Sequence, residues 1–153
     1  MDETEKNGTE ARRWWMGLLA KAPEDRLMVL WEGVAPRPEF RWLRRPETGA
    51  VMVRGRMGGT GAPFNLGEMT VTRCSLALAD GTVGHGYVQG RGAARAEAAA
   101  LIDALMQTGA ADAVRRTILD PLEEAMQAAR TARAAKAAAT KVDFFTLVRG
   151  EDA

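Results

Sequence analysis

Cysteine and histidine are nearly absent from this sequence: Cys74 and His85 are the only ones among its 153 residues. A disulfide framework, a zinc finger and a cysteine-ligated iron–sulfur cluster each need several such side chains. The composition therefore excludes these sites within the chain, and we expect it to bind no metal and no cofactor of its own.

Long hydrophobic runs are absent as well. No apolar stretch approaches the roughly 20 residues that span a membrane, and the first residues are acidic and polar, unlike a secretory signal peptide. We expect a soluble, cytoplasmic protein with no membrane partner.

An excess of one charge is also missing, since 21 basic residues face 20 acidic ones and the net charge is +1. This balance argues against a nucleic-acid partner. Residues 33–95, however, contain nine arginines and four acids, a local charge of +5. Arginine offers a planar fork of donors suited to phosphate and carboxylate oxygens. The region therefore favours an anionic ligand, although any one of these arginines is equally well explained as a solvated surface residue.

The order of the sequence patterns predicts one α+β domain. We expect residues 1–9 to form a flexible tail and residues 10–150 a single domain. Apolar residues recur with helical spacing over residues 10–21 and again after Pro23, which suits the first position of a helix. Four strand-like segments follow, separated by turn residues: 40–44, 50–57, 68–78 and 82–89. We therefore expect an antiparallel meander of about four strands, flanked by N-terminal and C-terminal helices.

The last third is predicted to be helical over residues 93–107 and 112–119. Asp120 followed by proline is typical of a new helix start with the aspartate as N-cap. The resulting helix, residues 121–140, is rich in alanine and has little to bury, so we expect it to be exposed. Residues 142–149 are apolar, and we expect them at a subunit interface.

A glycine-rich segment after the second predicted strand is the main candidate for chemistry. Consecutive backbone N–H groups in such turns can hold an anion, and residues 58–61 read Gly-Gly-Thr-Gly. The segment is neither a P-loop nor a dinucleotide fingerprint, because no Lys-Ser/Thr pair follows and no helix opens. A plain hairpin loop explains the same residues, and the pattern alone favours it. The candidates for phosphate or phosphonate binding are Arg56, Gly58, Gly59, Thr60, Gly61, Arg73 and Arg91.

Several features predict contacts with another subunit. Adjacent tryptophans on a helix point about 100° apart and cannot both face one core. Alternate glycines in the last strand leave a bare strip that another element can approach closely. The interface candidates are Trp14, Trp15, Gly84, Gly86, Phe144, Phe145 and Arg149.

The remaining reactive residues favour structural roles. His85 has no nucleophile at a recognisable spacing, and Cys74 alternates within a strand as a small buried side chain does. Asp103 is expected to be partly buried, as a cap or a bridge to another subunit. We assign no catalytic residue.

Short motifs occur in a fixed order between residues 12 and 150. They are Glu47-Thr48-Gly49, Arg56-Met57-Gly58-Gly59-Thr60-Gly61, Thr72-Arg73, Asp80-Gly81-Thr82, Val88-Gln89-Gly90-Arg91, Ala96-Glu97, residues 101–107 and residues 142–150. Together they resemble the PhnG family of the phosphonate carbon–phosphorus lyase system. The chain departs from the family pattern at His85-Gly86-Tyr87 and at Gly92-Ala93, which argues against a catalytic role for His85.

The resemblance implies a core complex with PhnH-, PhnI- and PhnJ-type subunits, two copies of each. Such a complex displaces adenine from ATP with an alkylphosphonate and yields ribose 1-phosphonate 5-triphosphate. ATP, expected to carry Mg²⁺, is then a substrate of the complex. The nucleosidase-like step is attributed to the PhnI-type subunit and the later radical cleavage to the PhnJ-type subunit. A PhnG-like chain is then an essential subunit of a transferase, chiefly architectural or site-completing.

Three roles for the chain stay open at this point. It contributes Arg56, the glycine segment and Arg73 to a phosphate-binding active site, or it is purely an interaction subunit. The third is a non-catalytic anion-binding or interaction module outside any lyase.

Overall fold

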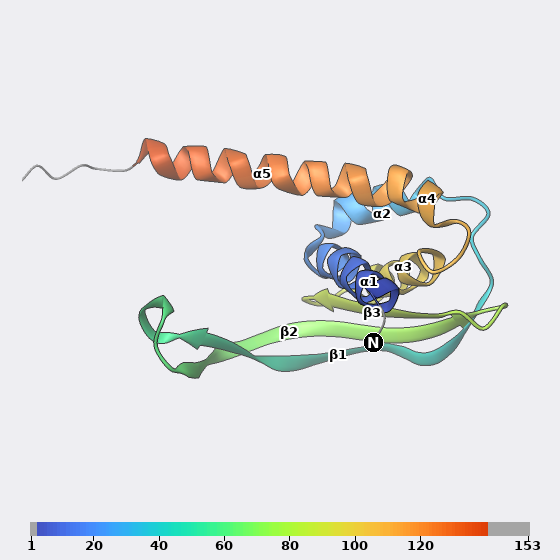
Figure 1. Cartoon of the computed structure of the whole chain (residues 1–153), viewed down its shortest axis with the longest axis horizontal. Helices are drawn as coiled ribbons and strands as arrows, with labels where there is room; N and C mark the ends of the chain where they lie inside the picture. Colours follow the sequence, from blue (N-terminus) through green and yellow to red (C-terminus); the bar gives the residue numbers. More distant parts are fainter. Residues whose placement is uncertain (1–2, 141–153) are drawn as a thin grey trace, which may run out of the picture.

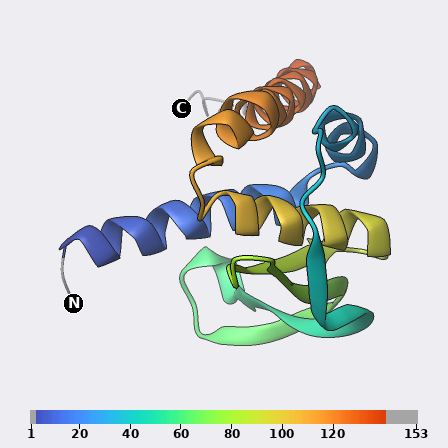
Figure 2. The ribbon, with the colours of Figure 1, turned by 90° about the vertical axis from the view of Figure 1, so that its right-hand side faces the viewer.

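A computed structural model describes residues 3–140 of the chain. The helices are α1 (Glu3–Lys21), α2 (Glu24–Glu32), α3 (Ala93–Leu105), α4 (Ala111–Val114) and α5 (Asp120–Ala139), and the strands are β1 (Phe40–Arg56), β2 (Pro63–Leu78) and β3 (Val83–Gln89). Helices α1 and α3 lie on one face of the sheet, and α2 and α5 lie over them (Figure 1). The other face of the sheet carries no helix from the described residues, as Figure 2 shows.

The sheet is antiparallel with the order β1-β2-β3, which confirms the α+β class. It has three strands and not about four, because the segments 40–44 and 50–57 belong to one strand. The expected turn around Pro46 stays paired, with Glu47 opposite Arg73 and Thr48 opposite Thr72. Shifts in register around Arg44 accommodate Pro46, which has no N–H to donate and is tolerated on an edge strand.

Helix α1 begins at Glu3, so the segment expected as a tail, residues 1–9, is helical from Glu3 onward. The reason lies in its composition. Residues 3–10 are almost entirely polar and carry no apolar stripe from which a period could be read.

The C-terminal helices are continuous, which corrects the expected restart at Asp120. Residues Arg115–Leu119 form a π-helical stretch between α4 and α5, and Leu119 and Asp120 both have helical backbone angles. Asp120 is therefore not an N-cap, and its carboxylate lies 3.5 Å from the Arg115 guanidinium. The wider π turn suits Pro121, which cannot donate the backbone hydrogen bond of a regular α-helix.

Helix α3 packs very closely on β3 because both surfaces lack side-chain bulk. A Cβ atom at Gly86 would fall far inside contact distance of the Ala96 carbonyl oxygen, and one at Gly84 would do the same to that of Ala100. The bare strip is therefore filled by a helix of the same chain. Gly84 and Gly86 are buried, so proposing them as contacts with another subunit was wrong.

Asp103 joins three elements from a fully buried position. Its carboxylate accepts hydrogen bonds from the Arg12 guanidinium at 2.7 and 3.1 Å, the Trp15 indole at 2.8 Å and the His85 backbone N–H at 2.9 Å. The His85 N–H belongs to the outer edge of the sheet, where a buried donor needs a partner. Asp103 thus bridges α1, α3 and β3 inside one chain, and not to another subunit.

Two elements extend beyond this core on the same side of the molecule (Figure 1). Strand β3 pairs with β2 only from Val71 to Ala77, so β2 from Pro63 to Thr70 pairs with β1 alone. We call this two-stranded part, residues 50–70, the β-arm. The second extension is α5, whose residues 127–139 are all exposed.

None of the helices between residues 3 and 140 is long and apolar enough to cross a membrane.

Candidate functional site

The predicted phosphate ligands do not converge on one point. Arg56 lies opposite Pro63 at the tip of the β-arm, whereas Arg73 lies opposite Glu47, nine residues further back along β1. At roughly 3.3 Å per residue, the two arginines are about 30 Å apart. They cannot bind the same phosphate, so the expected site formed by both arginines and the glycine segment is wrong as a single site.

The glycine segment is a hairpin loop that its own residues close. Gly58 and Gly59 have φ values of 60° and 82°, and the Gly61 N–H donates to the Met57 carbonyl at 2.8 Å. The Arg56 guanidinium donates to the Gly61 carbonyl at 3.1 Å. The loop, with Thr60 at its tip, is mostly solvent-exposed. Its geometry needs glycine for the left-handed backbone, whether or not an anion binds.

Arg73 lies in a polar cluster on the open face of the sheet. Its guanidinium is 3.7 Å from the Glu47 carboxylate, which is also 3.6 Å from Arg44, and Tyr87 lies opposite Arg73 on β3. A recess of about 140 Å³ is lined in part by Glu47, Arg73 and Tyr87. The Glu47 carboxylate already balances the charge of one of the two arginines. About half of each of the three charged side chains is exposed to solvent. The cluster is therefore a weak anion site by itself.

Ser75 and His85 meet on the same face, a contact that the sequence reading missed. The Ser75 hydroxyl and His85 Nδ1 are 2.9 Å apart. The Asp80-Gly81 turn provided the missing signal, because a tight turn there places residue 75 opposite residue 85. The pair is exposed and lacks a third orienting group among the described residues, so it does not form a triad.

Arg91 lies in the exposed loop between β3 and α3. The buried arginine at the start of α3 is Arg95, whose guanidinium donates to the carbonyls of Ala22 and Gln89. Arg95 therefore ties the end of α1 to the end of β3. This role was not predictable from the sequence, because an arginine in the first turn of a helix is usually exposed.

The residues proposed to contact another subunit lie in different environments. Trp15 is 8% exposed and belongs to the core, so its proposed interface role was wrong. Trp14 is half-buried, with its indole donating to Glu123 at 3.1 Å and its ring 5.1 Å from the Arg115 guanidinium. Phe144, Phe145 and Arg149, with the segment 142–149, lie outside the described residues.

Cys74 is buried under α3 and its thiol donates to the Ala96 carbonyl at 3.1 Å. Burial raises the pKa of this thiol from 9.0 to about 11. The folded state therefore holds the proton more tightly than the unfolded chain. The resulting contribution to stability is present below pH 9 and is lost as the pH rises through 11.

We accordingly expect Cys74 to be unreactive in the folded protein. At pH 8 a disulfide reagent such as Ellman's should label it about 100-fold more slowly than in urea, because only the exposed thiolate reacts. Comparable labelling rates in both conditions would contradict the buried position.

Among residues 3–140, no three His, Cys, Asp or Glu side chains group as a metal site would require. The described surface thus offers separated arginines and a projecting β-arm, but no assembled catalytic centre.

Comparison with known proteins decides the family. The sequence pattern of the family described as phosphonate metabolism protein PhnG matches residues 10–150. The chain belongs to the PhnG family. It is also 46% identical over 145 residues to the alpha-D-ribose 1-methylphosphonate 5-triphosphate synthase subunit PhnG of Rhizobium meliloti (strain 1021), covering 95% of this chain and 93% of that protein.

Membership in the PhnG family confirms the resemblance seen in the sequence motifs. The matched range includes the β-arm, its glycine loop and residues 141–150, which follow α5. The chain is thus a phosphonate metabolism protein, and its own part in that metabolism has to be argued from its surfaces.

Proposed function

We propose that this chain is the PhnG-type subunit of a phosphonate carbon–phosphorus lyase core complex. The complex transfers the ribose triphosphate of ATP to an alkylphosphonate and releases adenine. The proposal is supported by the name of the Rhizobium relative, a subunit of alpha-D-ribose 1-methylphosphonate 5-triphosphate synthase, and by the near full-length match to it.

Within that complex the chain acts mainly as an architectural or site-completing subunit. The observation that carries this role is the distance between Arg56 and Arg73. The strand register keeps these two residues apart. A phosphate site that uses either arginine needs ligands from another subunit. In this proposal the catalytic groups come from the partners.

The exposed apolar side chains of the β-arm support an assembly role. Met52 is 52% exposed and Leu66 is 66% exposed, and Met57 and Phe64 are also exposed. A two-stranded ribbon has only marginal stability in water by itself, and large exposed apolar patches are typical of interaction surfaces. A partner that covers the β-arm would stabilise it and bury these side chains.

The partners in this proposal are PhnH-, PhnI- and PhnJ-type subunits, two copies of each, in the cytoplasm. ATP, with Mg²⁺, enters as a substrate of the complex and not as a cofactor of this chain. Preparing the complex with and without this chain tests the proposal. We expect adenine release from ATP and methylphosphonate only when the chain is present. Full activity without it would contradict an essential role.

A further inference from the structure

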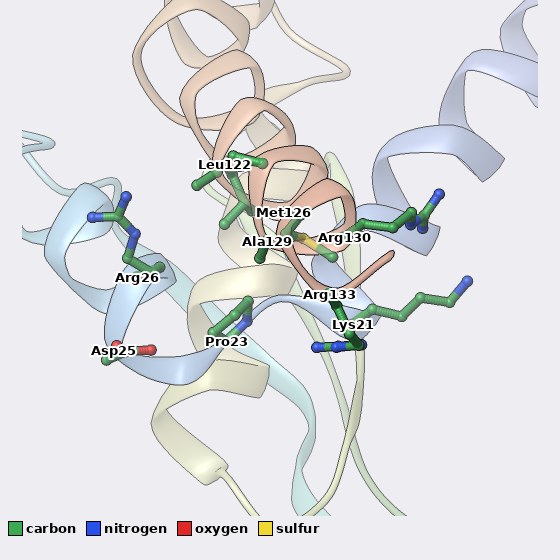
Figure 3. A pocket seen from close by; sticks show the side chains of 11 residues that line it. Lys21, Pro23, Asp25, Arg26, Leu122, Met126, Ala129, Arg130 and Arg133 are labelled. Atoms are coloured by element: carbon green, nitrogen blue, oxygen red, sulfur yellow. The ribbon is translucent and has the colours of Figure 1, made fainter. Parts of the chain in front are cut away.

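A groove of about 480 Å³ lies between α5, from Leu122 to Arg133, and the corner where α1 leads into α2 (Figure 3). Its floor is apolar, formed by the buried Leu122 and the half-buried Met126, with alanines beside them. Its rim carries Lys21 and Arg26 from the corner and Arg130 and Arg133 from α5. None of these residues belongs to the sites considered above.

The rim is strongly positive. Four cations face one acid, Asp25. Figure 3 shows Arg26 on one side of the groove and Lys21 and Arg130 on the other. In the described part of the chain, none of the four cations makes an ion pair or a side-chain hydrogen bond. Their charge is therefore available to an acidic partner.

We propose that this groove binds an acidic segment of a partner subunit, with apolar side chains on Leu122 and Met126 and carboxylates facing the cationic rim. Charge complementarity carries this choice, because unpaired cations around an apolar floor attract a ligand that is acidic and apolar together. The proposal rests on the proposed function, since it takes the partner from the same complex.

A protein segment fits the groove better than a nucleotide does. Among the described residues, no aromatic side chain lines the groove to stack on a base. The cations are spread over both walls and do not converge on one phosphate. Beyond the groove, α5 continues with residues 134–139, which are alanines apart from Lys136 and are all exposed. Small side chains allow another backbone to approach closely, so the contact can extend along the helix.

The test is co-purification of the chain with its PhnH-, PhnI- and PhnJ-type subunits. We expect Arg130→Glu/Arg133→Glu to weaken assembly by about tenfold or more, because truncating or reversing charges at an interface has effects of this size. The matched control is Arg13→Glu/Arg116→Glu, which reverses two exposed arginines away from the groove and should leave assembly unchanged. Circular dichroism verifies that each variant folds.

A second variant locates the occupant. Arg130→Lys/Arg133→Lys keeps the charges and supplies amines that carbodiimide can couple to a bound carboxylate. We expect mass spectrometry to find these lysines linked to an acidic segment of a partner subunit. Links to this chain's own Asp143, Glu151 or Asp152 instead would overturn the proposal, because the occupant would then be its own C-terminal segment.

Two further outcomes also overturn it. Equal assembly of Arg130→Glu/Arg133→Glu and wild type would show that the groove is not an interface, while the proposed function stands. Normal assembly with lost ATP binding would assign the groove to a nucleotide. If the wild-type chain joins none of the three subunits, the proposed function itself is wrong. That result is distinct from a defect seen only in the groove variants.

Discussion

Replacing Asp103 with alanine is expected to lower the free energy of unfolding by about 3–5 kcal/mol, because removing one member of a buried charged network leaves its partners unsatisfied. The carboxylate accepts from Arg12, Trp15 and the His85 backbone, and it is fully buried. Arg12 keeps access to water, because its side chain is 33% exposed. Most of the cost therefore comes from the Trp15 indole and the His85 backbone N–H, which lose their acceptor. For a chain of this size, the melting temperature should fall by roughly 10 °C.

The comparison variant is Glu97→Gln, which removes a carboxylate from the same helix where it makes no hydrogen bond among the described residues. Its effect should stay within about 0.5 kcal/mol. Trp15→Phe should lie between the two at about 1 kcal/mol, since it removes one donor and keeps most of the ring volume. If urea unfolding showed Asp103→Ala to be as stable as Glu97→Gln, the three-element bridge would carry no stability.

Gly86→Ala is expected to destabilise the fold by about 3 kcal/mol, because the added methyl group overpacks a rigid contact. The new Cβ would meet the carbonyl of Ala96, which belongs to the helix backbone, and would also lie 2.9 Å from the Cys74 sulfur. The Ala96 carbonyl cannot move without shifting α3 from β3. Because the shift opens the cover over Cys74, its labelling should become faster in this variant.

Gly49→Ala provides the matched control within the same sheet. Gly49 is also a strand residue, but an added Cβ there meets nothing within 4 Å. Alanine should be neutral at Gly49 or stabilise slightly, since glycine weakens a strand. Equal effects at positions 49 and 86, measured by thermal unfolding, would contradict the close packing of α3.

The sequence was sufficient for the α+β class because the Asp80-Gly81 turn and the two periodicities are local signals. It was insufficient where tertiary contacts decide. Pro46 looked like a turn, yet pairing of Glu47 with Arg73 keeps it in a long strand. The strip at Gly84 and Gly86 was recognised as a place of close approach, but only the packing of α3 shows which element fills it.

The candidate site was predictable in its residue types but not in its layout. A local reading placed Arg56 and Arg73 on flanking strands, and their separation depends on where β1 and β2 pair. No sequence pattern predicts the groove beside α5, because its cations come from segments about 100 residues apart in the sequence, Lys21 and Arg130 among them. Such a juxtaposition has no local period to reveal it.

The central claim, that the reaction requires this chain mainly for its architecture and not for Arg56 or Arg73 as phosphate ligands, is tested most directly by adenine release in the reconstituted complex. Complexes containing wild type, Arg56→Ala, Arg73→Ala or no PhnG-type chain would be compared with ATP and methylphosphonate. We expect turnover to vanish without the chain and to stay within about threefold of wild type in each single variant, since neither arginine lies in a closed ligand site. A loss of 100-fold or more in an intact Arg56→Ala or Arg73→Ala complex, an estimate typical of removing a group that stabilises transition-state charge, would contradict the account.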